Sequence, residues 1–234
     1  MEAKSVVAGL SLGVAVTALG AGDAYAQAQG AIPPLVERDG NWNTVSNVSL
    51  GLGVASVTLM PRVYYSSPDA TVGWKARWHF SSLAPVMSMV GTTLLVDQPI
   101  KEAIQSPRPD CTVDQTLARL DGSGCETFGG PSAHAFAAWG AFGYGTTVFL
   151  VDTFRYSDAE FSAGSLVGNV LVPFAAAVMT NVARGQDGAG VAHESTGQIV
   201  AGTLPGMGIG ALLGLGYSML QEPDCGYGGF VFCW

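Results

Sequence analysis

The stretch GGPSAHAFAAWGAFGYGTTVFLV, residues 129–151, belongs to a run without charged residues that begins at residue 127. It opens with two glycines, a proline and Ser132, and serine is among the preferred residues for capping a helix N-terminus. The apolar remainder has about the length, roughly 20 residues, that a helix needs to cross a bilayer. The stretch therefore predicts one long apolar helix that begins beside Ser132.

Five further runs lack Asp, Glu, Lys and Arg, and each is at least 18 residues long: 5–22, 40–61, 78–96, 161–183 and 195–221. No alternating strand pattern of useful length separates them. We predict an all-α fold, a helical bundle of five to six mostly apolar helices embedded in a membrane. Because the run 40–61 contains Asn, Ser and Thr, the helices of a compact soluble bundle are the alternative.

The composition favours a membrane environment. Of the 234 residues, 12% are charged, whereas soluble domains carry about 25% charged residues. Glycine occurs 32 times, which is typical of closely packed membrane helices. The net charge of -8 argues against a nucleic-acid partner, because binding a phosphate backbone needs clustered Lys and Arg.

The N-terminus has the pattern of an export signal. Lys4 precedes an apolar stretch over residues 6–22, and Ala24-Tyr25-Ala26 is a small-x-small cleavage site. Residues 1–26 are therefore expected to be a signal peptide or, if uncleaved, the first membrane helix. We expect a helical domain over 27–221 and a C-terminal tail over 222–234.

The polar segments alternate between two sides of the predicted membrane. If the first run passes from inside to outside, segments 97–126 and 184–194 both face the periplasm. The basic loop 62–77 then lies on the cytoplasmic side.

The chain has four cysteines: Cys111, Cys125, Cys225 and Cys233. In an exported chain an even number favours disulfides, and Cys111–Cys125 with Cys225–Cys233 is the simplest of three pairings. Four free thiols are the alternative. No Cys-x-x-Cys spacing occurs, so we expect no zinc site.

The first chemical motif is KEAIQSPRP, residues 101–109, at the end of an apolar run. Arg108 offers a planar fork to two phosphate oxygens, and Lys101 a point charge that can reach the same anion. The alternative is that both residues simply flank a membrane helix.

The second motif opens the stretch quoted above. Its paired glycines allow close approach of a ligand, and the free N–H groups of a helix N-terminus favour an anion. His134 in the first turn is placed to donate a proton to a leaving oxygen. An ordinary capped helix with a surface histidine is the alternative.

The third motif joins Arg184, which ends one apolar run, to His193, which precedes the next. A histidine at a helix start beside a cationic cluster is a candidate nucleophile towards phosphorus. The alternative is a solvent-exposed histidine in a loop.

In this order the three segments resemble the type 2 phosphatidic acid phosphatase / vanadium haloperoxidase superfamily, whose pattern is Lys-x6-Arg-Pro, Pro-Ser-Gly-His and Ser-Arg-x5-His-x3-Asp. Residues 101–109 match the first element completely, and 131–134 match the second except that Ala133 replaces Gly. The resemblance covers residues 101–202.

The third element departs from the family pattern. Ala183 replaces Ser, eight residues instead of five separate Arg184 from His193, and no Asp follows at the expected place. In the family that Asp orients the nucleophilic histidine, and carboxylates play this part elsewhere too. The candidates for its role here are Gln198, Glu194 and Asp187.

The resemblance implies a phosphate site and a role for each histidine. The phosphate-binding residues would be Lys101, Arg108, Ser132, the Ala133 backbone and Arg184. His193 would be the nucleophile that forms a phosphohistidine, and His134 would protonate the leaving alcohol. The family needs neither a metal nor another cofactor for hydrolysis.

We therefore expect a metal-independent phosphoric monoester hydrolase of the bacterial inner membrane. It would cleave a phosphate monoester or diphosphate of a membrane lipid at the periplasmic face. A soluble periplasmic acid phosphatase of the same superfamily is one alternative. An inactive phosphate-binding membrane protein is the other, because of the degenerate third motif. The sequence leaves the substrate and the oligomeric state open.

Overall fold

The computed structural model describes Arg38 and residues 40–65, 74–77, 83–118, 124–160, 162–186 and 191–220. Contacts divide the chain into two units, Met1–Pro34 and Leu35–Trp234, and every described residue belongs to the second. The predicted signal segment 1–26 and the predicted tail 222–234 lie outside the described residues.

The described part of the chain is predominantly helical. In chain order its elements are α1 (Gly40–Leu59), β1 (Arg62–Tyr65), β2 (Trp74–Arg77), α2 (Leu83–Leu95), η2 (Val96–Ile100), α3 (Lys101–Ile104), α4 (Val113–Leu117), α5 (Ala133–Tyr156), α6 (Ala163–Leu166), η3 (Val167–Leu171), α7 (Val172–Gly185) and α8 (Thr196–Leu220). Each of the five charge-free runs after residue 39 contains one long helical segment, so the predicted helical class is confirmed.

Two of these segments contain a π-helical turn. The turn η2 carries the chain from α2 into α3 and includes Pro99. Proline has no N–H to donate, and a wider turn keeps the chain helical around it. Likewise η3 joins α6 to α7 and ends two residues before Pro173. Residues 83–104 and 163–185 are therefore each one continuous helical path.

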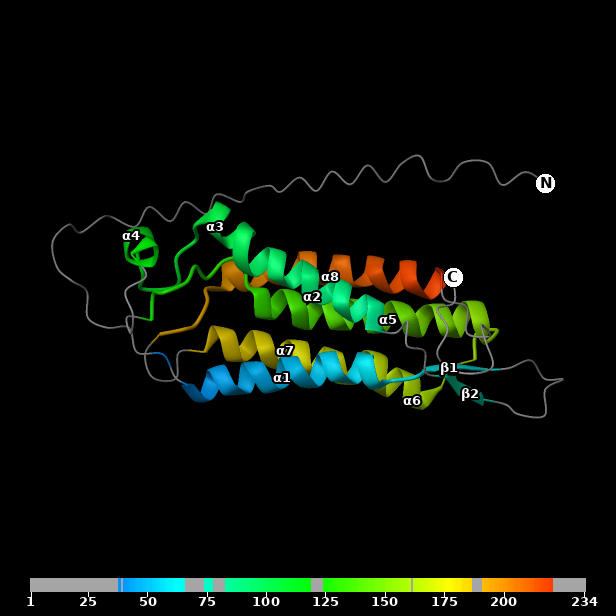
Figure 1. Ribbon diagram of the computed structural model, residues 1–234. Coiled ribbons are helices and arrows are strands. Elements are labelled where there is room, and N and C mark those ends of the chain that lie inside the picture. The colour runs from blue at the N-terminus through cyan, green and yellow to red at the C-terminus, as the bar shows by residue number, and fades with distance from the viewer. Residues whose placement is uncertain are drawn as a thin grey trace. The chain divides into compact units, whose positions relative to one another are not determined.

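The packing of α5 on α8 depends on glycine. The two helices lie side by side (Figure 1), and Gly202, Gly206 and Gly210 recur every four residues along the contacting face of α8. A Cβ at Gly206 would come within 2.3 Å of the Phe136 carbonyl oxygen, and one at Gly210 within 2.0 Å of the Gly140 oxygen. The backbones can approach this closely because small residues line the interface.

The remaining helices flank this pair. α1 lies along α7, and α2 contacts both α5 and α8. Figure 1 shows α3 and α4 at one end of the long helices and the antiparallel pair β1–β2 at the other. This pair lies in segment 62–77, which we predicted to be a loop. The prediction was wrong there because strands of four residues are too short to show an alternating pattern.

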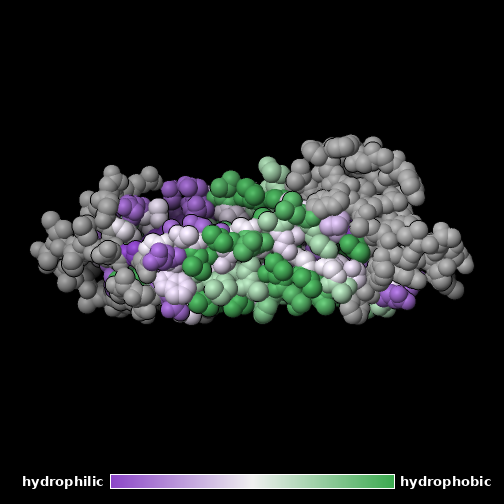
Figure 2. All heavy atoms as spheres, turned by 90° about the horizontal axis from the view of Figure 1, so that it is seen from below, coloured by the Kyte–Doolittle hydropathy of each residue, from purple (hydrophilic) through white to green (hydrophobic). Residues whose placement is uncertain are grey.

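Large hydrophobic side chains are exposed on the long helices. Leu52 of α1 is 59% exposed, Phe154 of α5 69% and Leu204 of α8 60%. Figure 2 shows such side chains gathered over the middle of one face, with hydrophilic ones towards an end. By length and composition, the segments Ala163–Gly185 and Thr196–Met219 could cross a membrane. Two of the five described runs therefore contain a helix that is long and apolar enough to cross a membrane.

Candidate functional site

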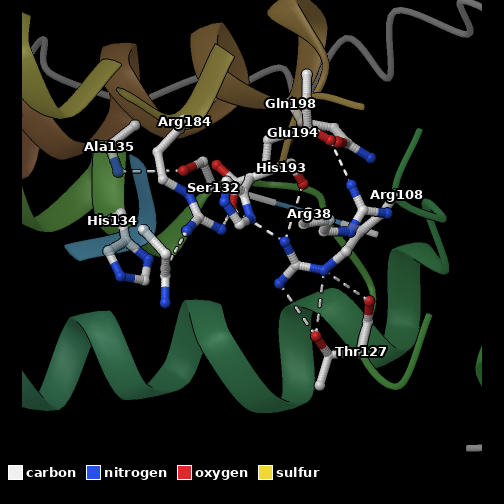
Figure 3. Close-up of polar contacts among 12 residues, drawn as sticks. Arg38, Arg108, Thr127, Ser132, His134, Ala135, Arg184, His193, Glu194 and Gln198 are labelled. Carbon is white, nitrogen blue, oxygen red and sulfur yellow. Dashed lines mark hydrogen bonds and ion pairs between the residues drawn. The ribbon is translucent and has the colours of Figure 1, made fainter. Parts of the chain in front are cut away.

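The three predicted motifs meet at the end of the bundle where α5 and α8 begin and α7 ends (Figure 3). The charges of Lys101, Arg108 and Arg184 all act on the ring of His134, so these side chains share one electrostatic environment. Residues far apart in sequence therefore come together in one place.

The first motif supplies two cations: Lys101 pairs with a carboxylate, and Arg108 connects two loops. Lys101 is 5% exposed, and its Nζ lies 2.8 Å from Oδ1 of Asp97, one helical turn earlier. Arg108 donates from Nε and Nη2 to Thr127, at 3.1 Å from the carbonyl oxygen and from Oγ1 respectively. Its Nη1 donates to the carbonyl oxygen of His193 at 2.9 Å. Arg108 thus joins the loop before α5 to the loop before α8.

The second motif begins α5 as predicted. Ser132 is the N-cap, fully buried, and its Oγ accepts a hydrogen bond from the Ala135 N–H at 3.1 Å. Its own N–H donates to the Gln198 carbonyl oxygen at 2.9 Å, which ties the start of α5 to the start of α8. In the first turn, His134 places Nε2 2.9 Å from Oδ1 of Asn47 on α1.

The third motif, Arg184 with His193, lies at the same end of the bundle. Arg184, in the last turn of α7, is 2% exposed and donates from Nη1 to Oδ1 of Asn43 at 3.0 Å. The Glu194 N–H donates to the Arg184 carbonyl oxygen at 3.1 Å, so the loop that carries His193 returns to α7. The side chain of His193 is buried beside this contact.

A carboxylate lies at the centre of the cations. Glu194 is 1% exposed, and its Oε1 lies 2.8 Å from Nη2 of Arg184 and 4.0 Å from Nη1 of Arg108. Burial alone would raise the pKa of this carboxyl. Arg184 together with hydrogen bonding from Ser132 and the charge of Arg108 instead holds the pKa below its ordinary value. The Glu194 carboxylate is therefore engaged with both arginines, and its role in orienting His193 stays a prediction.

Of the other two candidates for orienting His193, Gln198 is described by the structure and Asp187 is not. Gln198 forms a capping box with Ser195: its Oε1 accepts from the Ser195 N–H at 2.9 Å, and its own N–H donates to Ser195 Oγ at 3.3 Å. Its Nε2 donates to Ser106 Oγ at 2.9 Å and to the Pro107 carbonyl oxygen at 2.6 Å. We therefore assign Gln198 to holding the first motif against α8. Asp187 lies outside the described residues.

Arg38 is a site residue that our reading of the sequence missed. It donates to the carbonyl oxygens of Pro109 at 3.0 Å and Gly124 at 3.1 Å, and also to that of Ala192. Burial, and then the positive charges of Arg108 and Arg184, lower the pKa of its guanidinium to about 10. The only signal in the sequence was a lone arginine just before the charge-free run 40–61.

Two asparagines of α1 were also missed. Asn43 contacts Arg184 and Asn47 contacts His134. Their spacing of four residues puts both on one face of the helix. That spacing, inside an otherwise apolar run, is the signal from which they could have been found.

Cys111 and Cys125 form the predicted disulfide across 14 residues. It closes the segment between the first and second motifs, and Nη2 of Arg38 lies 3.4 Å from Cys111 Sγ. Cys225 and Cys233 lie outside the described residues. The disulfide therefore restrains the loops around the cationic site.

An apolar cavity of about 240 Å³ lies between α1, α2 and α5. Leu50 of α1 and Val90 of α2 line it, with Ala137 and Ala141 of α5. Residues 134, 137 and 141 share one face of α5, so the cavity begins about one helical turn beyond His134. The polar site and the apolar cavity are neighbours along the same helix.

Within the described ranges, no group of three or more His, Cys, Asp and Glu side chains is arranged to hold a metal ion. No family model, curated protein or solved structure matches the chain. What the site does is therefore argued from its own residues.

Proposed function

We propose that this chain is a membrane phosphatase of the type 2 phosphatidic acid phosphatase / vanadium haloperoxidase superfamily. It removes phosphate from a monoester or diphosphate of a membrane lipid at the periplasmic face of the bacterial inner membrane. The observation that carries the proposal is the convergence of two arginines, a capped helix N-terminus and two histidines from three distant segments. Such a set is suited to stabilising the charge on a transferring phosphoryl group.

In the proposed reaction, a ring nitrogen of His193 attacks phosphorus and the bond to the ester oxygen breaks. His134 gives a proton to the departing alkoxide, which leaves as an alcohol. Water then attacks the phosphohistidine, its proton passes to His134, and the P–N bond breaks to release phosphate. The balance is one ester and one water consumed, with one alcohol and one phosphate formed. The cations Arg108 and Arg184, with the α5 N-terminus, bind the phosphoryl oxygens.

The choice of a lipid substrate rests on the surroundings of the site. The cavity between α1, α2 and α5 is apolar and begins about one helical turn beyond His134, which suits a hydrocarbon tail attached to a bound phosphate. Exposed hydrophobic side chains on the same helices support contact with a bilayer. The lipid tail would enter from the bilayer, and the arginines would bind the phosphate.

A second candidate is an inactive phosphate-binding membrane protein. The observation in its favour is Glu194, whose carboxylate already lies against Arg184 and Arg108. An assay of turnover separates the two candidates, because only the phosphatase releases phosphate.

The decisive test is phosphate release by purified protein in detergent micelles, with a panel of lipid phosphates and soluble phosphate esters. We expect His193→Ala to lose activity by about 10³-fold or more, because the nucleophile is removed. We expect Arg184→Ala to lose about 10²-fold, because one charge-stabilising group is removed. Activity should persist in EDTA.

Arg155→Ala is the matched control for Arg184→Ala. Arg155 is an exposed arginine in the last turn of α5, far along the helix from the capped end. Its removal should leave turnover unchanged. Undiminished turnover in His193→Ala would rule out the phosphohistidine route. Absence of turnover by wild type with every substrate would favour the binding protein.

A further inference from the structure

Glu194 contacts the same groups that the proposed function assigns to phosphate. Its Oε1 lies 2.8 Å from Arg184 and 4.0 Å from Arg108, and Ser132 at the N-cap of α5 hydrogen-bonds to the carboxyl group. Figure 3 shows this carboxylate among the labelled arginines. A carboxylate and a phosphate are both oxyanions, and arginine binds either through the same N–H groups. The two anions therefore compete for one set of donors.

The hydrogen bonding between Glu194 and this set of donors is incomplete. Arg184 Nε and Glu194 Oε2 are buried, and neither has a hydrogen-bond partner in the described part of the chain. A buried donor or acceptor without a partner destabilises the folded state. A phosphate presents more acceptor oxygens than a carboxylate, so it can satisfy Nε as well as Nη2. Exchange of one anion for the other would thus complete the hydrogen bonding of Arg184.

The backbone around Glu194 is held on both sides. Its own N–H donates to the Arg184 carbonyl oxygen at 3.1 Å, and the next N–H, that of Ser195, donates to Gln198 Oε1 at 2.9 Å. Release of this buried carboxylate from the arginines must therefore come from rotation about its side-chain bonds while the loop stays in place. This movement keeps His193, the preceding residue, beside the site.

We propose that Glu194 is an internal competitor of phosphate: its carboxylate occupies the anion site, and a phosphate group binds only when that side chain turns out. The inference rests on the proposed function, since it concerns the same site. It gives the chain a self-neutralised resting state, in which the buried arginines are never without a counter-charge. Only a ligand with a stronger set of acceptors, such as a phosphate ester, replaces the carboxylate.

The test is the binding of inorganic phosphate to the full chain in detergent, measured by isothermal titration calorimetry. We expect Glu194→Gln to bind phosphate about tenfold more tightly than wild type, because the competing charge is removed from contact with the arginines. Glu160→Gln removes an exposed carboxylate that follows α5 at its far end and should bind like wild type. Glu194→Asp keeps the charge but shortens its reach, so its affinity should fall between the other two.

A measurement of stability covers the case in which Glu194→Gln is poorly folded, since its arginines have lost a buried partner. Added phosphate should then raise the thermal unfolding midpoint of this variant more than that of wild type. If wild type binds phosphate and neither Glu194 variant binds it more tightly, the competitor role is overturned and the proposed phosphate site stands. If no variant binds phosphate, the site itself is wrong and the competitor role falls with it.

Discussion

Arg38 shows how one half-buried cation can order several loops. Its guanidinium donates to backbone carbonyl groups at Pro109, Gly124 and Ala192, which lie in three separate loops around the site. The first of these residues follows Arg108, and the last precedes His193. Since arginine presents five donors in a rigid fork, a single side chain can hold these loops at once.

Arg38→Ala should therefore loosen the site as well as the fold. We expect a loss of about 2 kcal/mol in the free energy of unfolding, because hydrogen bonds from a charged group are removed and half-buried carbonyl groups are left without them. Phosphate release should fall several-fold. Circular dichroism melts and the turnover assay check both effects.

Arg38→Lys provides the comparison for that experiment. It keeps the charge but offers a single point donor, so it should recover only part of the stability. A melt of Arg38→Ala indistinguishable from wild type would contradict the clamping role.

At the scale of the helix, the stripe of glycines on α8 decides how closely α5 approaches. Gly206 faces the backbone of Phe136, whereas a Cβ added at Gly208 would meet nothing within 4 Å. The two glycines belong to the same helix, two residues apart, and differ only in the face on which they lie. They form a matched pair for testing the contact.

Gly206→Ala should destabilise the protein by about 1–3 kcal/mol, because the added methyl group forces the two backbones apart. Gly208→Ala should instead be neutral or stabilising by up to about 1 kcal/mol, because it only removes the conformational cost of a glycine within a helix. Thermal or denaturant unfolding in detergent measures both changes. An equal effect of the two substitutions would argue against close α5–α8 packing.

At the scale of the whole molecule, the exposed hydrophobic side chains bear on where the protein resides. They occur on α1, α2, α5, α7 and α8, so they are not confined to one helix. Monomeric soluble proteins rarely expose apolar patches larger than a few hundred Å². Contact with lipid removes this surface from water, and each side chain removed is favoured at about 25 cal/mol per Å².

We accordingly expect the protein to stay in the membrane pellet after extraction with alkaline carbonate. A peripheral or soluble protein is released by this treatment, whereas a protein with spanning helices is retained. Immunoblotting of pellet and supernatant gives the result. Recovery in the supernatant would reject the integral-membrane proposal and favour the soluble periplasmic alternative.

Much of the secondary structure was predictable because its causes are local. The absence of charge over about 20 residues marked each long helix, and Ser132 marked the start of α5 through its own side chain. The strands β1 and β2 were not predictable, since each has four residues and their pairing joins Arg62 to Arg77, which are distant along the chain. A cross-strand contact leaves no local pattern.

The sequence by itself determined the helical class, the candidate motifs and the simplest pairing of Cys111 with Cys125, because spacing and residue type along the chain encode them. Only the tertiary structure decided which groups the charged and polar side chains of the site contact. In the folded chain Glu194 pairs with Arg184, and Gln198 hydrogen-bonds to the Pro107 carbonyl group. Arg38 donates to carbonyl groups of loops beyond residue 100. Buried charges take whatever counter-charge or carbonyl group the packing of distant helices brings within reach, and that proximity is a property of the fold.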